Sequence, residues 1–206
     1  MQPRSYKFLI FKKVKSIMLL LLFTEGLHAK ETFITIEMAL SAHPKNDEYR
    51  VTGSGGSSYT RGTMNTFGVG RKIDLSSLHS RIEPTLGYQL YSNLSYSHII
   101  YFELPLLYTY SVLGQDISMG PSLKYLYIAK TAINSYNGNV PIDQTKSAFS
   151  YGLKLMLEKE SFDFYVKYDY LTHANFNIYT NDGTTRTQID IDMSGSYMSL
   201  GIRWKF

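Results

Sequence analysis

Hydrophobic and polar residues alternate along most of the chain after residue 32. In the segment 97–110, the even positions form a nearly unbroken apolar row: His98, Ile100, Phe102, Leu104, Leu106, Tyr108 and Tyr110. Successive side chains of a β-strand point to opposite faces, so this period of two predicts a strand with one apolar face. The same pattern predicts strands at 33–40, 63–73, 80–91, 117–127, 149–158, 162–170 and 198–206.

The connections between these strands alternate in length. Long polar segments follow the first, fifth and seventh strands, at 42–61, 131–147 and 175–192. Shorter segments follow the other strands, at 74–79, 92–95, 111–116 and 159–161. Short turns at one end and long loops at the other are typical of β-barrels in bacterial outer membranes.

The two faces of the strands distinguish a membrane barrel from a water-soluble barrel or sandwich. The apolar face carries large aromatic residues on nearly every strand, and the opposite face carries Gly, Ser, Thr and a few charges. A soluble barrel turns its apolar face inward, and we expect such bulky residues not to fit inside eight strands. The sequence therefore predicts an all-β, eight-stranded antiparallel transmembrane up-and-down β-barrel with a cramped polar interior.

The first 29 residues have the pattern of a secretory signal peptide. Five basic residues precede the apolar stretch 16–24, and the small residue Ala29 is the expected cleavage point. The stretch is too short for a transmembrane helix, which needs about 20 apolar residues. We expect residues 1–29 to be removed and 30–206 to form the barrel domain.

Removal of this leader changes the charge of the protein. Residues 1–29 hold five of the 21 Lys and Arg residues and one of the 17 Asp and Glu residues, which leaves 16 of each. A nearly neutral mature chain gives no reason to expect nucleic-acid binding. The chain has no cysteine, so disulfides and thiol chemistry are excluded.

Several segments of the chain resemble a known family. They are FELPLLYTY (102–110), ISMGPSLKYL (117–126), YGLKLML (151–157), FDFYVKYDY (162–170) and SLGIRWKF (199–206). These resemble the small outer-membrane β-barrels of Gram-negative bacteria, the opacity-like and OmpA-like surface proteins, over nearly all of 32–206. Three prolines depart from ideal strands and should mark bulges or interrupted pairing, at Pro84, Pro105 and Pro121.

The resemblance implies a location in the outer membrane and a set of partners. The barrel-assembly machinery would recognise the last strand, with an assembly signal made of Met198, Leu200, Ile202, Trp204 and Phe206. The barrel would contact outer-membrane lipid and lipopolysaccharide. An extracellular ligand would bind through the loops 42–61, 131–147 and 175–192.

Nine charged residues lie on the face opposite the apolar rows. They are Glu37, Arg81, Glu83, Glu103, Lys124, Lys154, Lys167, Asp169 and Arg203. An isolated buried charge is very costly, so we expect both signs to pair in a closed network that fills the lumen. An ion path would need a wider barrel than eight strands provide.

Two functions follow from this fold. The first is surface interaction, adhesion or a structural role, with no enzyme activity, metal or cofactor. The alternative is a lipid A deacylase that uses His173, because residues 171–177 resemble the His-x-Ser-Asn motif of outer-membrane lipid A deacylases; here Asn175 occupies the position of the nucleophilic Ser. The segment 53–58, GSGGSS, is expected to be a flexible loop tip rather than a phosphate loop.

Overall fold

A computed structural model describes residues 29–41, 48–52, 57–59, 62–75, 79–92, 95–135, 138–142, 145–172, 174–181 and 186–206. The predicted signal peptide therefore lies outside the described residues except for Ala29, and its cleavage stays a prediction. Over the described ranges, no helix has the length and apolar character needed to cross a bilayer.

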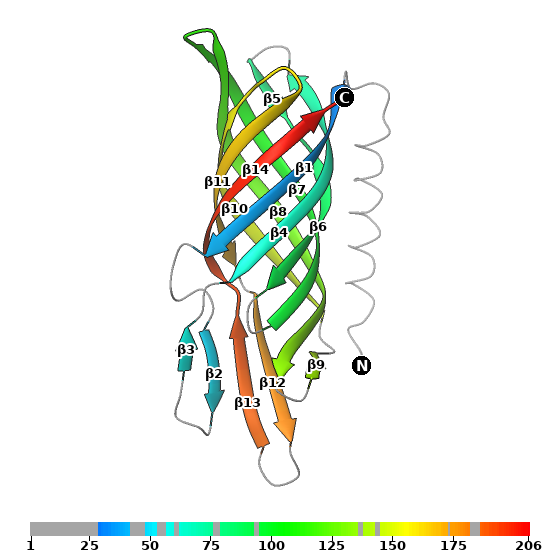
Figure 1. Ribbon diagram of the computed structural model, residues 1–206, viewed down its shortest axis with the longest axis vertical. Helices are drawn as coiled ribbons and strands as arrows, with labels where there is room; N and C mark the ends of the chain where they lie inside the picture. Colours follow the sequence, from blue (N-terminus) through cyan, green and yellow to red (C-terminus); the bar gives the residue numbers. More distant parts are fainter. Residues whose placement is uncertain are drawn as a thin grey trace, which may run out of the picture.

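Eight antiparallel strand positions close into a barrel, as predicted (Figure 1). In order around the ring they are β1 (Ala29–Ser41), β4 (Thr63–Leu75), β5 (Ser80–Ile82) with β6 (Thr85–Ser92), β7 (Ser95–Val112), β8 (Gln115–Ser135), β10 (Lys146–Leu157), β11 (Phe162–Thr172) and β14 (Gly195–Lys205). β5 and β6 share one position because both pair with β4 and β7. The ring closes between the first and last strands, where Ile34 pairs with Trp204.

Pro84 and Pro105 interrupt strand pairing, as expected, whereas Pro121 stays in the ladder with β10 opposite Leu153. Pro84 separates β5 from β6, yet its carbonyl accepts the N–H of Arg71 at 3.2 Å. Pro105 pairs with Ser122, but the β7–β8 ladder omits the next two residues of β7. There Gly120 lies so close to β7 that an added Cβ would be 1.9 Å from the Leu106 carbonyl oxygen. A separate register shift between His98 and Ile99 involves no proline.

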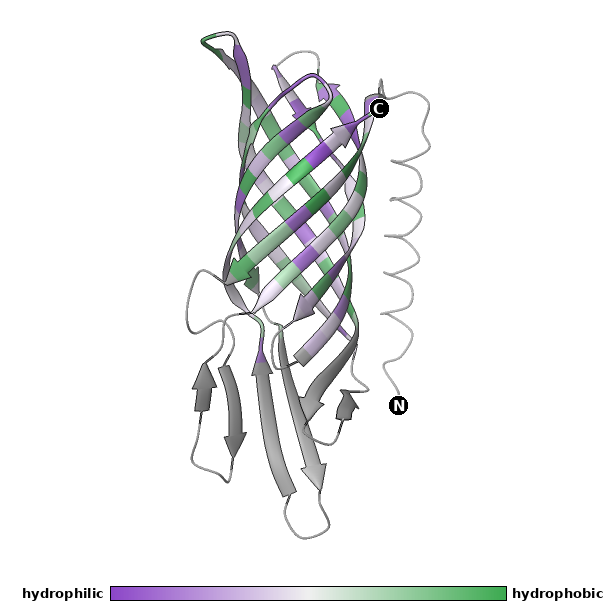
Figure 2. Ribbon diagram, in the orientation of Figure 1, coloured by the Kyte–Doolittle hydropathy of each residue, from purple (hydrophilic) through white to green (hydrophobic). Residues whose placement is uncertain are grey.

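The outer wall carries the predicted apolar rows. Along β7, Ile100, Tyr108 and Tyr110 are exposed and Glu103 is buried, and Figure 2 shows hydrophobic and hydrophilic residues alternating along the strands of the near wall. The stretch from His98 to Tyr108, at a rise of about 3.3 Å per residue and a tilt of about 40°, covers about 25 Å. This height matches the lipid-facing band of an outer-membrane barrel.

The long connections in the second half of the chain form strands of their own. β8 continues into a hairpin with β9 (Gly138–Ile142), which closes with Ser135 opposite Gly138. β12 (Asn175–Asn181) and β13 (Arg186–Asp192) form a second hairpin.

The expectation of a flexible loop tip at 53–58 is wrong for Ser57 and Ser58, which lie in a strand of the long connection 42–61. This segment contains β2 (Glu48–Thr52) and β3 (Ser57–Tyr59), and residues 53–56 lie outside the described part. β2 pairs antiparallel with β13, so that Val51 is opposite Ile189. The result is one four-stranded sheet in the order β12-β13-β2-β3, outside the barrel ring at the end opposite the short turns (Figure 1). The alternation pattern did not predict β2, because the backbone hydrogen bonds of β2 are made with β13, which is distant in sequence.

The interior also differs from the expected set of small and charged residues. Five aromatic side chains are buried, from Phe33, Tyr91, Tyr101, Tyr165 and Tyr197. They fit because glycines face several of them. A Cβ added at Gly70 would be 2.4 Å from the ring of Phe33, one at Gly68 would be 2.2 Å from the hydroxyl of Tyr101, and one at Gly201 would be 2.1 Å from Tyr165. Because these glycines have no side chain, the aromatic rings occupy the space that a Cβ would fill.

Candidate functional site: the closed lumen

All nine charged residues predicted to face the lumen are buried there. They come from every position of the ring except β4, and each lies in the inward phase of its strand or, for Glu83, at the break between β5 and β6. The structure divides them into two groups. We call the group nearer the short turns the Arg203 cluster and the group nearer the middle of the barrel the Lys167 cluster.

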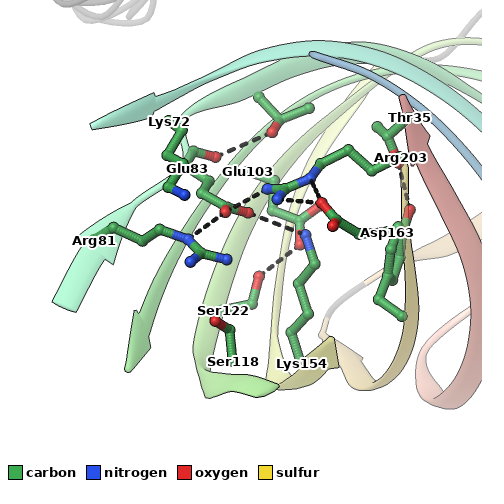
Figure 3. Close-up of polar contacts among 12 residues, drawn as sticks. Thr35, Lys72, Arg81, Glu83, Glu103, Ser118, Ser122, Lys154, Asp163 and Arg203 are labelled. Atoms are coloured by element: carbon green, nitrogen blue, oxygen red, sulfur yellow. Dashed lines mark hydrogen bonds and ion pairs between the residues drawn. The ribbon is translucent and has the colours of Figure 1, made fainter. Parts of the chain in front are cut away.

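Arg203 forms the centre of its cluster. Its Nε donates to Asp163 Oδ2 at 2.6 Å, and its Nη1 pairs with Glu83. Figure 3 shows the guanidinium between these two carboxylates. The Cζ atom lies 4.8 Å from the centroid of the Phe33 ring, which covers one face of the cation.

Glu83 connects Arg203 to two further bases. Its Oε1 accepts a hydrogen bond of 2.7 Å from Arg81 Nε, and its Oε2 lies 3.5 Å from Lys154 Nζ (Figure 3). Arg81 also pairs with Glu158 at 2.6 Å. A charge-assisted network of this kind holds strands β5, β10 and β14 together across the lumen.

Lys167 is surrounded by carboxylates. Its Nζ lies 2.7 Å from Glu37 Oε2, 3.3 Å from Glu103 Oε1 and 3.3 Å from Asp169 Oδ2. Lys124 reaches the same group, at 3.8 Å from Glu37 and 3.7 Å from Asp169. The Lys167 cluster thus contains two bases and three acids.

Hydroxyl groups complete the Lys167 cluster. Ser122 Oγ donates to Glu103 Oε1 at 2.7 Å, and the Tyr165 hydroxyl donates to Glu37 Oε2 at 3.1 Å. The ring of Tyr165 also lies 4.5 Å from Lys154 Nζ and so joins the two clusters. Each hydroxyl shares its carboxylate oxygen with Lys167, so these oxygens accept from two donors.

Sequence reasoning missed one member of the network, Asp163. This residue is fully buried, and besides Arg203 it accepts from Lys205 Nζ at 3.0 Å and from the backbone N–H of Lys159 at 2.9 Å. The signal was present, because Asp163 shares its phase with Lys167 and Asp169 on β11. With Asp163 included, the buried charges of the described residues are five acids and five bases.

The half of the lumen nearer the long connections is apolar. Its buried residues form one cluster, made of Ala39, Met64, Tyr91, Ile99, Tyr101, Leu126, Ile128, Ala148, Leu171, Ala174, Met193 and Tyr197. Between this apolar layer and the Lys167 cluster lies a cavity of about 10 Å³, which has room for about one water molecule. The lumen of the described barrel is therefore filled by two ionic clusters and an apolar layer.

The other predicted site residues are placed only in part. His173 lies outside the described residues, so the structure gives no geometry for the deacylase alternative, and Asn175 is the first residue of β12. Within the described ranges, no group of three His, Cys, Asp or Glu side chains could hold a metal ion. The proposed assembly signal faces outward on β14, with Met198, Leu200, Trp204 and Phe206 exposed.

Comparison with known proteins gives structural likenesses alone. No protein-family model and no curated protein matches the chain. Neisserial surface protein A is 15% identical, with a TM-score of 0.47 over 88% of this chain and 100% of the other. The N-terminal barrel of Pseudomonas aeruginosa OprF is 12% identical, with a TM-score of 0.42 over 84% of this chain and 97% of that one.

The attachment invasion locus protein Ail of Yersinia pestis is a third similar structure. It is 14% identical, with a TM-score of 0.42 over 85% of this chain and 98% of the other. These similar structures are small outer-membrane barrels, the group that the sequence resemblance indicates. By its own strand pairing, the chain is an eight-stranded antiparallel β-barrel of the outer-membrane type.

Proposed function

We propose that this chain is a non-conducting surface protein of a bacterial outer membrane that binds a partner outside the cell through the sheet β12-β13-β2-β3. The observation that carries the proposal is the pairing of β2 with β13, which joins the first and last long connections. A surface held by backbone hydrogen bonds loses less conformational entropy on binding than separate mobile loops would.

The filled lumen supports the same proposal. The five buried acids and five buried bases of the two ionic clusters balance and make close contacts, and the apolar layer lies between them and the long connections. The cavity beside Gln89 and Ser199, inside the barrel, has a volume of only about 10 Å³, which is too small for a ligand. Recognition is therefore assigned to the long connections, where binding residues of a rigid scaffold commonly lie.

Export and assembly form part of the proposal. The signal peptide 1–29 would direct the chain across the inner membrane, and the outward row that ends at Phe206 would be read by the barrel-assembly machinery. In the assembled protein, lipid and lipopolysaccharide would surround the outer wall. We assign no enzyme activity to the chain, because Asn175 lacks the oxygen nucleophile that the deacylase mechanism needs.

A cell-binding assay tests the proposal. A strain lacking the protein is complemented with the parent or with one of two variants. In the first variant, short turns replace both 46–60 and 174–193. In the matched control, a short turn replaces 131–144. Binding to cultured epithelial cells, immobilised matrix protein and purified lipopolysaccharide is measured at equal surface abundance. We expect the first variant to lose binding and the control to retain it. Equal binding by the parent, both variants and the empty strain would contradict the proposal.

A further inference from the structure

A groove of about 710 Å³ crosses the outer wall of the barrel where its first and last strands meet. Its lining residues lie on β4, β1, β14, β11, β10 and the start of β8, and β11, β14 and β1 are seen side by side on the near wall in Figure 1. Its lining is almost wholly apolar and includes Ile36, Met38, Val166, Leu200, Ile202 and Trp204. Four of its lining residues, Glu37, Thr66, Met156 and Tyr165, have side chains buried on the inner side of the wall, and none of the lining belongs to the proposed binding sheet.

The strand register places short branched side chains between longer ones in this groove. Ile36 and Ile202 are direct cross-strand partners, and Val166 pairs with Leu200. Along the strands, Trp204 lies toward the short turns and Met38 toward the long connections. The groove therefore runs along the wall between a tryptophan at one end and a flexible methionine at the other.

The position of the groove determines what can fill it. Its exposed residues, among them Ile36, Met38 and Leu200, belong to the outward rows that meet lipid, so the groove is continuous with the hydrocarbon-facing surface of the barrel. Unfilled apolar surface forfeits dispersion contacts, and the groove volume lies in the range of about 300 to 1,000 Å³ typical of ligand sites. In a bilayer core, the flexible apolar groups available to fill such a groove are the acyl chains of lipids.

We propose that this groove binds an acyl chain of a phospholipid from the leaflet next to the short turns. Tryptophan is enriched at membrane–water interfaces, so Trp204 indicates the end of the groove from which the chain enters. A lipid held in the groove exchanges more slowly than the lipids around the rest of the wall. The groove also discriminates more strongly between acyl chains of different length.

The single tryptophan of the chain provides the measurement. The protein is reconstituted in phospholipid vesicles, and quenching of Trp204 by phospholipids brominated on their acyl chains is measured in competition with unbrominated phospholipids of different chain length. A wall that contacts only exchanging lipid weakly prefers the chain length that matches its hydrophobic thickness, and a substitution that fills the groove leaves this weak preference unchanged. The groove predicts a several-fold preference for one length.

Two matched substitutions separate the groove from the general lipid surface. Val166→Phe fills the groove, whereas Val69→Phe adds the same ring on β4, where Val69 is exposed and does not line the groove. We expect Val166→Phe to abolish the chain-length preference and Val69→Phe to retain it. Heat-modifiable migration on gels verifies that both variants are folded.

Three outcomes would overturn the assignment. The first is a parent protein without chain-length preference. The second is an equal loss of preference in both variants. The third is displacement of the brominated phospholipid by purified lipid A at lower concentration than by phospholipid, which would assign the groove to the other leaflet.

Discussion

The guanidinium of Arg203 shows what a charge requires inside this barrel. It is completely buried, and the carboxylates of Glu83 and Asp163 and the ring of Phe33 surround it. Removing an ion from water costs several kcal/mol, and only close partners offset that cost. The network is therefore stable as a whole, but removal of any one charged residue leaves a partner charge without its counterion.

Glu103 allows this to be tested in the Lys167 cluster. Glu103→Leu removes one of the three carboxylates around Lys167 and the acceptor of Ser122, so we expect a loss of about 3 to 5 kcal/mol in unfolding free energy. Urea unfolding in phospholipid vesicles measures the loss, and the folded gel band should disappear at lower temperature than that of the parent. Glu160→Leu, at an exposed turn position, is the control and should change stability by less than about 0.5 kcal/mol. Equal midpoints for the two variants would contradict a tightly paired lumen.

At the scale of elements, the β7–β8 hairpin carries local backbone strain. Its two-residue turn consists of Leu113 at φ 51° and Gly114 at φ 74°, and both angles are positive as a type I′ turn requires. A branched apolar residue is unfavourable there, and Leu113 is 98% exposed, so it gains no packing in return. Asn adopts this conformation more readily.

Leu113→Asn is therefore expected to stabilise the barrel by about 1 kcal/mol, the cost of a left-handed conformation for an ordinary residue. Equilibrium unfolding in vesicles measures the change. Leu113→Ala serves as the control, because it removes the exposed side chain but keeps an unfavourable residue at positive φ. A gain of the same size in both variants would attribute the effect to lost hydrophobic exposure instead of backbone strain.

The strands and their faces were predictable because they depend on a local period of two. That period placed Glu37, Lys167 and Arg203 inside correctly, and it also placed Asp163 in the same phase. The inward aromatics were not predictable, since the space for Tyr165 depends on Gly201, which is distant in sequence. The β2–β13 pairing was missed for a similar reason: nothing within 42–61 indicates that its partner is β13.

At the scale of the whole molecule, the layers of the lumen determine its permeability. Eight strands enclose an interior just wide enough for side chains, whereas open aqueous channels belong to barrels of about 16 to 18 strands. We expect negligible steady conductance in planar bilayers. A 16-stranded porin in the same bilayer serves as the positive control. A stable ion-selective pore of large conductance would show that the ionic clusters and the apolar layer do not close the lumen.

The β2–β13 pairing also has an immunological consequence. Arg50 lies opposite Asp190 and Val51 opposite Ile189, although these residues belong to opposite ends of the mature chain. An antibody whose epitope spans both strands would recognise no linear peptide from either segment. Its epitope forms only when the last hairpin meets the first connection, so the antibody would distinguish finished molecules from chains stalled during assembly. Escape mutations could arise in either of two distant stretches of the gene.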